Sequence, residues 1–254
     1  MMQISEAVIL MAGAGSRLVR PESGALKPLT PVVERPLVSY IFEALTDSGI
    51  DVIHAVVGYQ GELLIEQVKR VVPRGLDVRF IQNPHWQKQN GISVLAAAGR
   101  AKPPFVLTMS DHLFDHDLLT ILLRRSKRSG LNLAIDRKIE SIVDIDDAMK
   151  VQIRRNRVIN IGKELSHYNG IDTGLFVANE ELFDYLNAAK REGDCSLADG
   201  VRLMADDGKV HAIDVGDAWW QDVDTPRTLA AAENHLRSRL NAACLTTAGS
   251  RAQS

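Results

Sequence analysis

The sequence predicts an α/β protein with a mixed, mostly parallel sheet. Short apolar runs alternate with longer segments of helical periodicity, and this alternation is typical of βαβ units. The first apolar run, residues 6–11, ends at a glycine-rich turn, where sheets of this class commonly bind ligands. The chain has 254 residues, of which 45% are apolar, so it can form the core of one large domain.

The first half of the chain supplies the regular part of the predicted sheet. Apolar runs predict strands over residues 6–11, 52–57, 77–81, 104–109 and 131–135. The segments between them predict helices over residues 36–48, 60–71, 91–100 and 115–127.

The second half is less regular. We expect a hairpin over residues 149–153 and 157–162, followed by a core strand over 171–178. Helices are predicted over residues 179–190, 196–205 and 225–240. The domain should therefore span residues 1–240. The small, polar residues 241–254 should form a disordered tail.

Composition narrows the class of protein. The formal net charge is −2, which does not suggest a nucleic-acid partner. Cys195 and Cys244 form no metal or redox motif, in keeping with a reducing compartment. No signal peptide opens the chain, and no apolar run approaches the ~18 residues that span a bilayer. We therefore expect a cytoplasmic protein without a membrane span.

The turn after the first strand is the most informative segment. It contains Gly13 and Gly15 followed by Arg17, and Lys27 lies ten residues further on. Glycine lets backbone N–H groups approach phosphate oxygens, and basic side chains neutralise them. Leu18 stands where a dinucleotide fingerprint needs glycine or alanine, and no P-loop pattern is present. The turn predicts a different nucleotide-phosphate site, formed by Ala12, Gly13, Gly15 and Ser16. An ordinary strand-to-helix turn is the alternative.

Two acidic segments predict a metal site. Asp111 follows the apolar run 104–109, so it should lie at the same edge of the sheet as the glycine turn. Asp222 and Asp224 come directly before Thr225-Pro226. Carboxylate oxygens are the ligands that Mg²⁺ prefers, and we expect Asp111 to hold Mg²⁺ together with Asp222 or Asp224. Helix capping is the alternative interpretation of both segments.

Polar residues elsewhere suggest further contacts with substrates. Asn83, Asn90 and Ser93 lie between a predicted strand and helix, where they can read a base or ribose or simply cap the helix. Lys150 and Lys163 flank the predicted hairpin. They can bind the phosphate of an acceptor, although most single lysines are only solvated.

Taken together, these segments resemble the inositol-1-phosphate cytidylyltransferase branch of the sugar-phosphate nucleotidyltransferase superfamily. The resemblance covers about residues 6–238 and implies one Rossmann-like nucleotidyltransferase domain with a small hairpin insertion on the acceptor side. The matching segments are Gly13-Ala14-Gly15-Ser16-Arg17 with Lys27-Pro28, Met109-Ser110-Asp111-His112, Asp136-Arg137, Met149-Lys150-Val151, Ile161-Gly162-Lys163, Ile171-Asp172-Thr173-Gly174 and Trp220-Gln221-Asp222-Val223-Asp224-Thr225-Pro226.

The resemblance also implies a reaction and its participants. Inositol 1-phosphate would attack the α-phosphorus of CTP, giving CDP-inositol and pyrophosphate, with Mg²⁺ as the cofactor. A separate membrane alcohol phosphotransferase would consume the product. Arg17 and Lys27 would be catalytic. The residues that would bind the acceptor are Asp136, Lys150, Lys163 and Asp172.

Phosphocholine, an aminoalkylphosphonate and a hexose 1-phosphate are alternative acceptors. Tyr168 and Phe176 are the only aromatic residues between positions 120 and 180. Choline is usually held by an aromatic cage, so this region favours a polyol phosphate. A non-catalytic nucleotide-binding subunit is the remaining alternative. The carboxylates predicted to bind metal argue against it.

Overall fold

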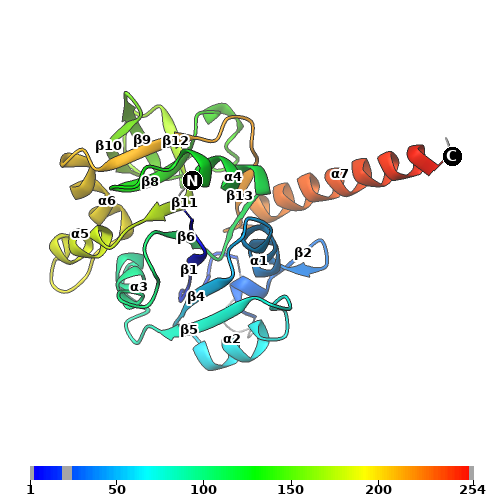
Figure 1. The fold of residues 1–254 in the computed structure, drawn as a ribbon, viewed down its shortest axis with the longest axis horizontal. Coiled ribbons are helices and arrows are strands. Elements are labelled where there is room, and N and C mark those ends of the chain that lie inside the picture. Colours follow the sequence, from blue (N-terminus) through cyan, green and yellow to red (C-terminus); the bar gives the residue numbers. More distant parts are fainter. Residues whose placement is uncertain (1–2, 19–24, 252–254) are drawn as a thin grey trace.

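A computed structural model describes residues 3–18 and 25–251 (Figure 1). Nine strands form one sheet in the order β5-β4-β1-β6-β11-β8-β12-β10-β9. Their bounds are β1 (Glu6–Met11), β4 (Val52–Val57), β5 (Asp77–Gln82), β6 (Phe105–Met109), β8 (Leu131–Asp136), β9 (Lys150–Arg154), β10 (Arg157–Gly162), β11 (Gly170–Ala178) and β12 (Val210–Asp214).

The sheet has a parallel part and a mixed part. Strands β5, β4, β1 and β6 run parallel to one another. β11 is antiparallel to both β6 and β8 and joins this part to the rest, while β12 is parallel to β8. The predicted α/β class and mixed sheet are confirmed. Strand β12 was not expected from the sequence.

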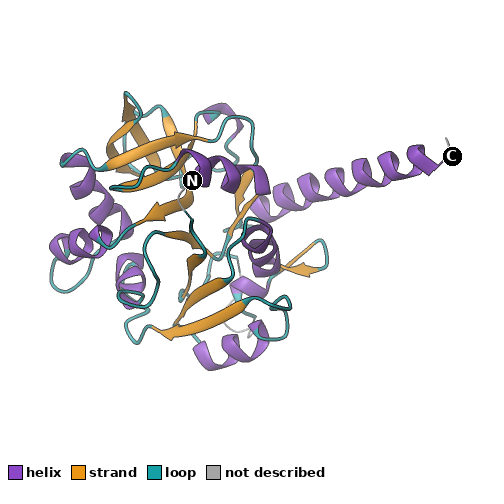
Figure 2. Ribbon diagram, viewed as in Figure 1, coloured by secondary structure: helices purple, strands orange, loops and turns teal. Residues whose placement is uncertain are grey.

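Helices cover both faces of the sheet (Figure 2). One hydrophobic core contains residues of α1, α2, α4 and α7, and the other contains residues of α3, α5 and α6. The result is a three-layer α/β/α arrangement. The helices are α1 (Leu37–Asp47), α2 (Gly61–Val68), α3 (Asn90–Ala96), α4 (His116–Arg125), α5 (Glu181–Ala189), α6 (Leu197–Asp206) and α7 (Pro226–Arg251).

Strand β1 shows why the apolar runs become central strands. Ala7, Ile9 and Met11 face one core, and Val8 and Leu10 face the other. Successive side chains point to opposite faces of a strand. A strand covered by helices on both faces must therefore be apolar throughout. This places the turn that follows Met11 at the edge where the parallel strands end.

The predicted hairpin is present as β9 and β10. Its turn residues Arg155 and Asn156 have φ angles of 49° and 59°, the left-handed conformation of a two-residue hairpin turn. A second hairpin, β2 (Pro31–Val32) and β3 (Arg35–Pro36), was not expected. It turns in the same way, with Val33 and Glu34 at positive φ.

Two short strands far apart in the sequence bring the acidic segments together. β7 (His112–Phe114) pairs with β13 (Trp220–Asp222), and the register places Asp222 opposite His112. The backbone N–H of Val223 also donates to the carbonyl of Asp111. This pairing joins the segment after β6 to the segment before α7.

Helix α7 is longer than the predicted helix over 225–240. It extends to Arg251 and projects from the body of the domain (Figure 1). The structure thus has a helix where the sequence suggested a disordered tail. Residues 241–245 include alanine and leucine, which propagate an existing helix without a new nucleation step. Within the described residues, no helix is long and apolar enough to cross a bilayer.

Candidate active site

One pocket of about 330 Å³ surrounds the glycine-rich turn after β1. The predicted phosphate-site residues Ala12, Gly13, Gly15 and Ser16 line it, and so do residues from four other segments. These further lining residues include Arg17, Lys27, Trp86, Asn90, Ser93, Asp111 and Asp224.

Gly15 can be no other residue without a change in the turn. Its φ is +63°, and an added Cβ would lie 2.4 Å from the Cβ of Lys27. At Gly13, by contrast, an added Cβ would meet no atom of the described residues within 4 Å. Gly15 thus lets the turn pack against Lys27, whereas Gly13 borders open space where a ligand's phosphates can lie close to the backbone.

The two predicted cations contact the predicted metal ligands. Lys27, which is 8% exposed, pairs with Asp224 and with Asp111, the latter at 2.5 Å. Arg17 also pairs with Asp224. Burial raises the pKa of the Asp111 carboxyl, but the charge of Lys27 outweighs it and holds this pKa well below its usual value.

His112 is a further charged group beside Asp111, in addition to Lys27. Its Nδ1 lies 2.7 Å from an Asp111 oxygen, and its ring stacks on Trp220 with centroids 6.2 Å apart. Burial alone would lower the pKa of His112, but the hydrogen bond and charge of Asp111 raise it to about 9. His112 is therefore a cation near neutral pH.

Asp222 differs from Asp111 and Asp224 in that it has no ion pair with a lysine or arginine of the described residues. Its Oδ1 is buried and has no hydrogen-bond partner in the described part of the chain. Burial and the charge of Asp111 raise the pKa of Asp222. Oxygen or nitrogen atoms of Asp111, His112 and Asp222 lie within 4.8 Å of one another, as do those of Asp147, Asp222 and Asp224. An unpartnered buried oxygen in such a cluster fits a hard divalent cation.

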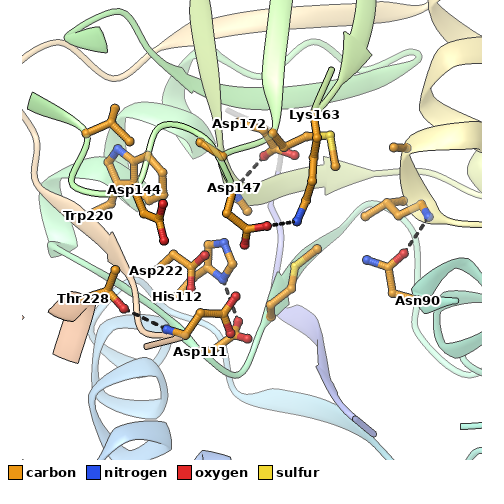
Figure 3. Close-up of a pocket in the computed structure, with 18 of the residues that line it drawn as sticks. Asn90, Asp111, His112, Asp144, Asp147, Lys163, Asp172, Trp220, Asp222 and Thr228 are labelled. Carbon is orange, nitrogen blue, oxygen red and sulfur yellow. Dashed lines mark hydrogen bonds and ion pairs between the residues drawn. The ribbon is translucent and has the colours of Figure 1, made fainter. Parts of the chain in front are cut away.

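A second pocket, of about 260 Å³, adjoins the first (Figure 3). Among the predicted acceptor-binding residues, Lys163 and Asp172 line it. Burial raises the pKa of Asp172 to about 6. Its Oδ1 accepts a 2.7 Å hydrogen bond from the backbone N–H of Gly174. Asp144, Asp147, Phe176 and Trp220 also line this pocket.

The two pockets meet at a common border. Arg17, Asn90, Met109, Asp111 and Asp224 line both of them. Three charged groups, those of Arg17, Asp111 and Asp224, therefore lie where a ligand in one pocket would touch a ligand in the other.

Three predicted site residues line neither of these two pockets. Asn83 is 1% exposed, donates to Ser93 Oγ and accepts from the backbone N–H of His85. Asp136 is 2% exposed and accepts from Trp220 Nε1 at 2.9 Å. Lys150 donates to the backbone carbonyl of Lys163 at 2.6 Å. Each of them contacts a residue that does line a pocket, so the structure places them one layer behind the site.

Asp147 is a site residue that the sequence did not reveal. It pairs with both Lys163 and Arg17 and lies in the loop between the 3₁₀ turn η3 (Ile139–Ser141) and β9. Several acidic residues occur in this loop, and no spacing rule distinguishes Asp147 among them. Only its contacts with Lys163 and Arg17 distinguish it from the others.

Comparison with known proteins identifies the family of this fold and site. The MobA-like NTP transferase domain matches residues 7–194. The chain belongs to this family. The match includes the glycine turn, Lys27 and Asp111, but ends before Asp222 and Asp224.

Curated relatives extend the likeness over most of the chain. A bifunctional IPC transferase and DIPP synthase from Rubrobacter xylanophilus is 35% identical over 229 residues, which are 89% of this chain and 51% of the relative. A protein of the same name from Thermococcus kodakarensis is 32% identical and is covered to 50%. The chain thus spans about half the length of these relatives.

Solved structures agree with the fold. The inositol-1-phosphate CTP transferase of T. maritima has a TM-score of 0.79 and 26% identity, with 88% of this chain and 90% of that chain covered. A putative glucose-1-phosphate thymidylyltransferase of Bacillus anthracis has a TM-score of 0.77 at 17% identity, covering 91% of this chain and 95% of its own. The second likeness concerns the fold alone.

Proposed function

We propose that the chain transfers CMP from CTP to inositol 1-phosphate, forming CDP-inositol and releasing pyrophosphate. The observation that carries this proposal is the border between the pockets, where Arg17, Asp111 and Asp224 line both. A nucleotidyltransferase needs a nucleotide phosphate and an acceptor phosphate in contact, with positive charge at that point. The names of the T. maritima structure and the curated relatives support the choice of acceptor.

The turn after β1 would bind the triphosphate. Backbone N–H groups of Gly13, Gly15 and Ser16 are the donors of this turn, and Arg17 and Lys27 are the cations beside it. Both cations are now paired with carboxylates. The phosphates must therefore share or replace these pairs. Since the acceptor phosphate is already an anion, the reaction needs positioning and charge neutralisation rather than a strong base.

Asp222 would hold Mg²⁺ together with Asp111 or with Asp224, since it shares a cluster of possible ligands with each of them. The buried, unpartnered oxygen of Asp222 supports this assignment, and the all-oxygen donor set fits a hard cation. When bound, Mg²⁺ would neutralise charge on the phosphates. Lys27 lies between two of these carboxylates, so it keeps them neutralised on the side that faces the turn.

The second pocket would hold the inositol ring. Lys163 supplies a cation for its phosphate, and Asp172 and Asp144 supply acceptors for its hydroxyl groups. Among the described residues, Phe176 and Trp220 are the only aromatic ones that line the pocket together with the His112 ring. We assign Lys150, Asp136 and Asn83 supporting positions behind Lys163, Trp220 and Ser93.

The product would then be consumed by an alcohol phosphotransferase. The curated relatives carry a second, DIPP synthase activity in their names, which supports a reaction of this kind downstream. The membrane character of that partner and the cytoplasmic location of this chain stay predictions from the sequence.

Pyrophosphate release by the purified chain tests the proposal. We expect turnover with Mg²⁺, CTP and inositol 1-phosphate, and much slower turnover when UTP or dTTP replaces CTP. Phosphocholine, an aminoalkylphosphonate and glucose 1-phosphate serve as competing acceptors. Faster turnover with phosphocholine would contradict the inositol assignment and leave the cytidylyltransferase standing. Binding of CTP without turnover of any acceptor would favour the non-catalytic subunit.

A further inference from the structure

Asp147 connects the two pockets by its two carboxylate oxygens. Oδ1 pairs with Nζ of Lys163, on the acceptor side, and Oδ2 pairs with a guanidinium nitrogen of Arg17, in the nucleotide turn. Figure 3 shows Asp147 and Lys163 pointing toward each other across the pocket. Burial raises the pKa of the Asp147 carboxyl, but its hydrogen bonds to Lys163 and Arg17 lower it overall. Asp147 is therefore an anion between two cations.

The loop that carries Asp147 is also tied to Lys163 through the backbone. Lys150 Nζ donates to the carbonyl of Lys163 at 2.6 Å and lies 3.4 Å from the carbonyl of Asp146. The N–H of Ala148 donates to the carbonyl of Asp144 at 3.1 Å. Two contacts thus join the loop to the end of β10. One is the hydrogen bond from Lys150 to the carbonyl of Lys163, and the other is the ion pair between Asp147 and Lys163.

Both partners of Asp147 are long side chains that solvent reaches. The side chains of Arg17 and Lys163 are 52% and 42% exposed, so packing alone does not fix them. Two cations held close together repel each other, and an anion between them removes that repulsion. Arg has five N–H donors and Lys has three. Each therefore keeps donors for a phosphate while it is paired with Asp147.

We propose that Asp147 is a positioning residue that aligns the acceptor-side lysine, Lys163, with the nucleotide-side arginine, Arg17, for phosphate-to-phosphate attack. The inference rests on the proposed function, because both cations act there on substrate phosphates. In this role Asp147 contacts the two cations and not the substrate phosphates. It fixes the separation of the two cations, and geometry of this kind governs the rate of an in-line displacement.

Removing the negative charge of Asp147 should have opposite effects on turnover and on the affinity for the acceptor. Asp147 opposes the binding of an anionic acceptor while it orients the cations that bind it. Asp147→Asn should therefore lower kcat by about 10- to 100-fold through lost alignment. The same change should tighten the binding of inositol 1-phosphate by about two- to fivefold, because an exposed competing ion pair is removed.

The experiment measures both quantities on the purified full chain. Initial rates with saturating CTP and Mg²⁺ give kcat and KM for inositol 1-phosphate, and calorimetry gives its Kd. Asp146→Asn is the matched control, since Asp146 is a neighbouring exposed aspartate whose side chain has no ion pair among the described residues. It should change neither quantity. Asp147→Glu, which restores the charge, should recover part of kcat.

A double variant tests whether Asp147 acts through Lys163. The loss of kcat caused by Asp147→Asn should be smaller when Lys163 is already Met, because coupled residues are not additive. Full additivity would overturn the proposal. An unchanged kcat, or weaker acceptor binding in Asp147→Asn, would overturn it too, since a collapsed loop weakens binding.

The proposed function can fail separately. Absence of turnover in the wild-type chain would refute the transferase activity. Calorimetry with inorganic phosphate would then still test whether Asp147→Asn strengthens anion binding, and unchanged or weaker phosphate binding would overturn the inference.

Discussion

The two pockets differ in which parts of the chain line them. The nucleotide-side pocket surrounds one turn, which follows a buried parallel strand and packs against Lys27, and residues from other segments complete its lining. The acceptor-side pocket is lined by side chains from β10, β11, β13 and the loop before β9. The shape of a single turn is fixed by its own local sequence. A pocket made by paired side chains depends on contacts between distant parts of the chain.

The largest expected effect concerns Lys27, where the rigid turn meets the carboxylates. Lys27→Ala should lower kcat about 100- to 1,000-fold, the usual cost of losing a preorganised electrostatic contact. It also removes the cation that Asp111 and Asp224 share, so the melting temperature should fall in EDTA and partly recover with Mg²⁺. Retention of more than about a tenth of the wild-type rate would show that Lys27 is not a catalytic contact.

Asp111 tests the border between the pockets. Asp111→Asn keeps the shape of the side chain but removes the charge that a hard cation needs, so Mg²⁺-dependent activity should be largely lost. A Mg²⁺ titration of initial rates measures this. Asp117→Asn, an exposed aspartate in the first turn of α4, is the control and should titrate like the wild type. An unchanged Mg²⁺ requirement in Asp111→Asn would remove Asp111 from the metal site.

The two lysines that flank the hairpin distinguish a residue that would contact the acceptor from one that supports this residue. Lys163 lines the acceptor pocket, whereas Lys150 binds the carbonyl of Lys163. Lys163→Met should raise KM for inositol 1-phosphate about 10- to 100-fold, as expected for a lost hydrogen bond to a charged group. Lys150→Met should raise it only a few-fold. KM for CTP should stay the same in both variants. Equal effects of the two changes would remove the distinction.

Asp136 tests whether side chains of the acceptor pocket depend on the layer behind them. Asp136→Ala leaves Trp220 Nε1 without its acceptor, which should destabilise the fold by about 1–3 kcal/mol. KM for the acceptor should rise a few-fold while KM for CTP is unchanged. Trp220→Phe removes the donor and should make the Asp136→Ala change milder. Denaturant unfolding and initial rates measure the two effects, and an equal shift in both KM values would contradict this view.

The smallest effect is a pH dependence of stability that arises from Asp172. Burial raises its pKa to about 6, so the folded chain holds this proton more tightly than the unfolded chain. The resulting stabilisation is complete below the unfolded pKa, near 4, and is lost as pH rises to about 6. Asp172→Asn should remove it. The melting temperature of this variant relative to wild type should rise by a few °C between pH 4 and 7. A constant difference would contradict the shift.

Local sequence was a good guide to the parallel half of the molecule. The predicted strands over 6–11 and 52–57 match β1 and β4 residue for residue. Strands buried on both faces are continuous apolar runs, and this pattern needs no knowledge of their neighbours. The turn after β1 could also be recognised from local sequence, because its positive φ and its close approach to Lys27 require glycine at position 15.

Sequence reasoning was weaker where function depends on which side chain meets which. Asn83, Asp136 and Lys150 are residue types that bind substrates, and nothing local shows that they contact Ser93, Trp220 and the carbonyl of Lys163. β7 and β13 are only three residues long, too short to give a periodic signal.

The sequence by itself determined the α/β class, the edge of the sheet at which the glycine turn and Asp111 lie, and the residue types gathered there. Each of these follows from apolar periodicity or from the steric needs of a single turn. Only the tertiary structure decided how the charges pair: Lys27 with Asp111 and Asp224, and Asp147 with Arg17 and Lys163. The reason is physical. Ion pairs depend on distances of a few ångströms between residues more than 80 positions apart in some of these pairs, and the packing of the sheet and its loops sets those distances.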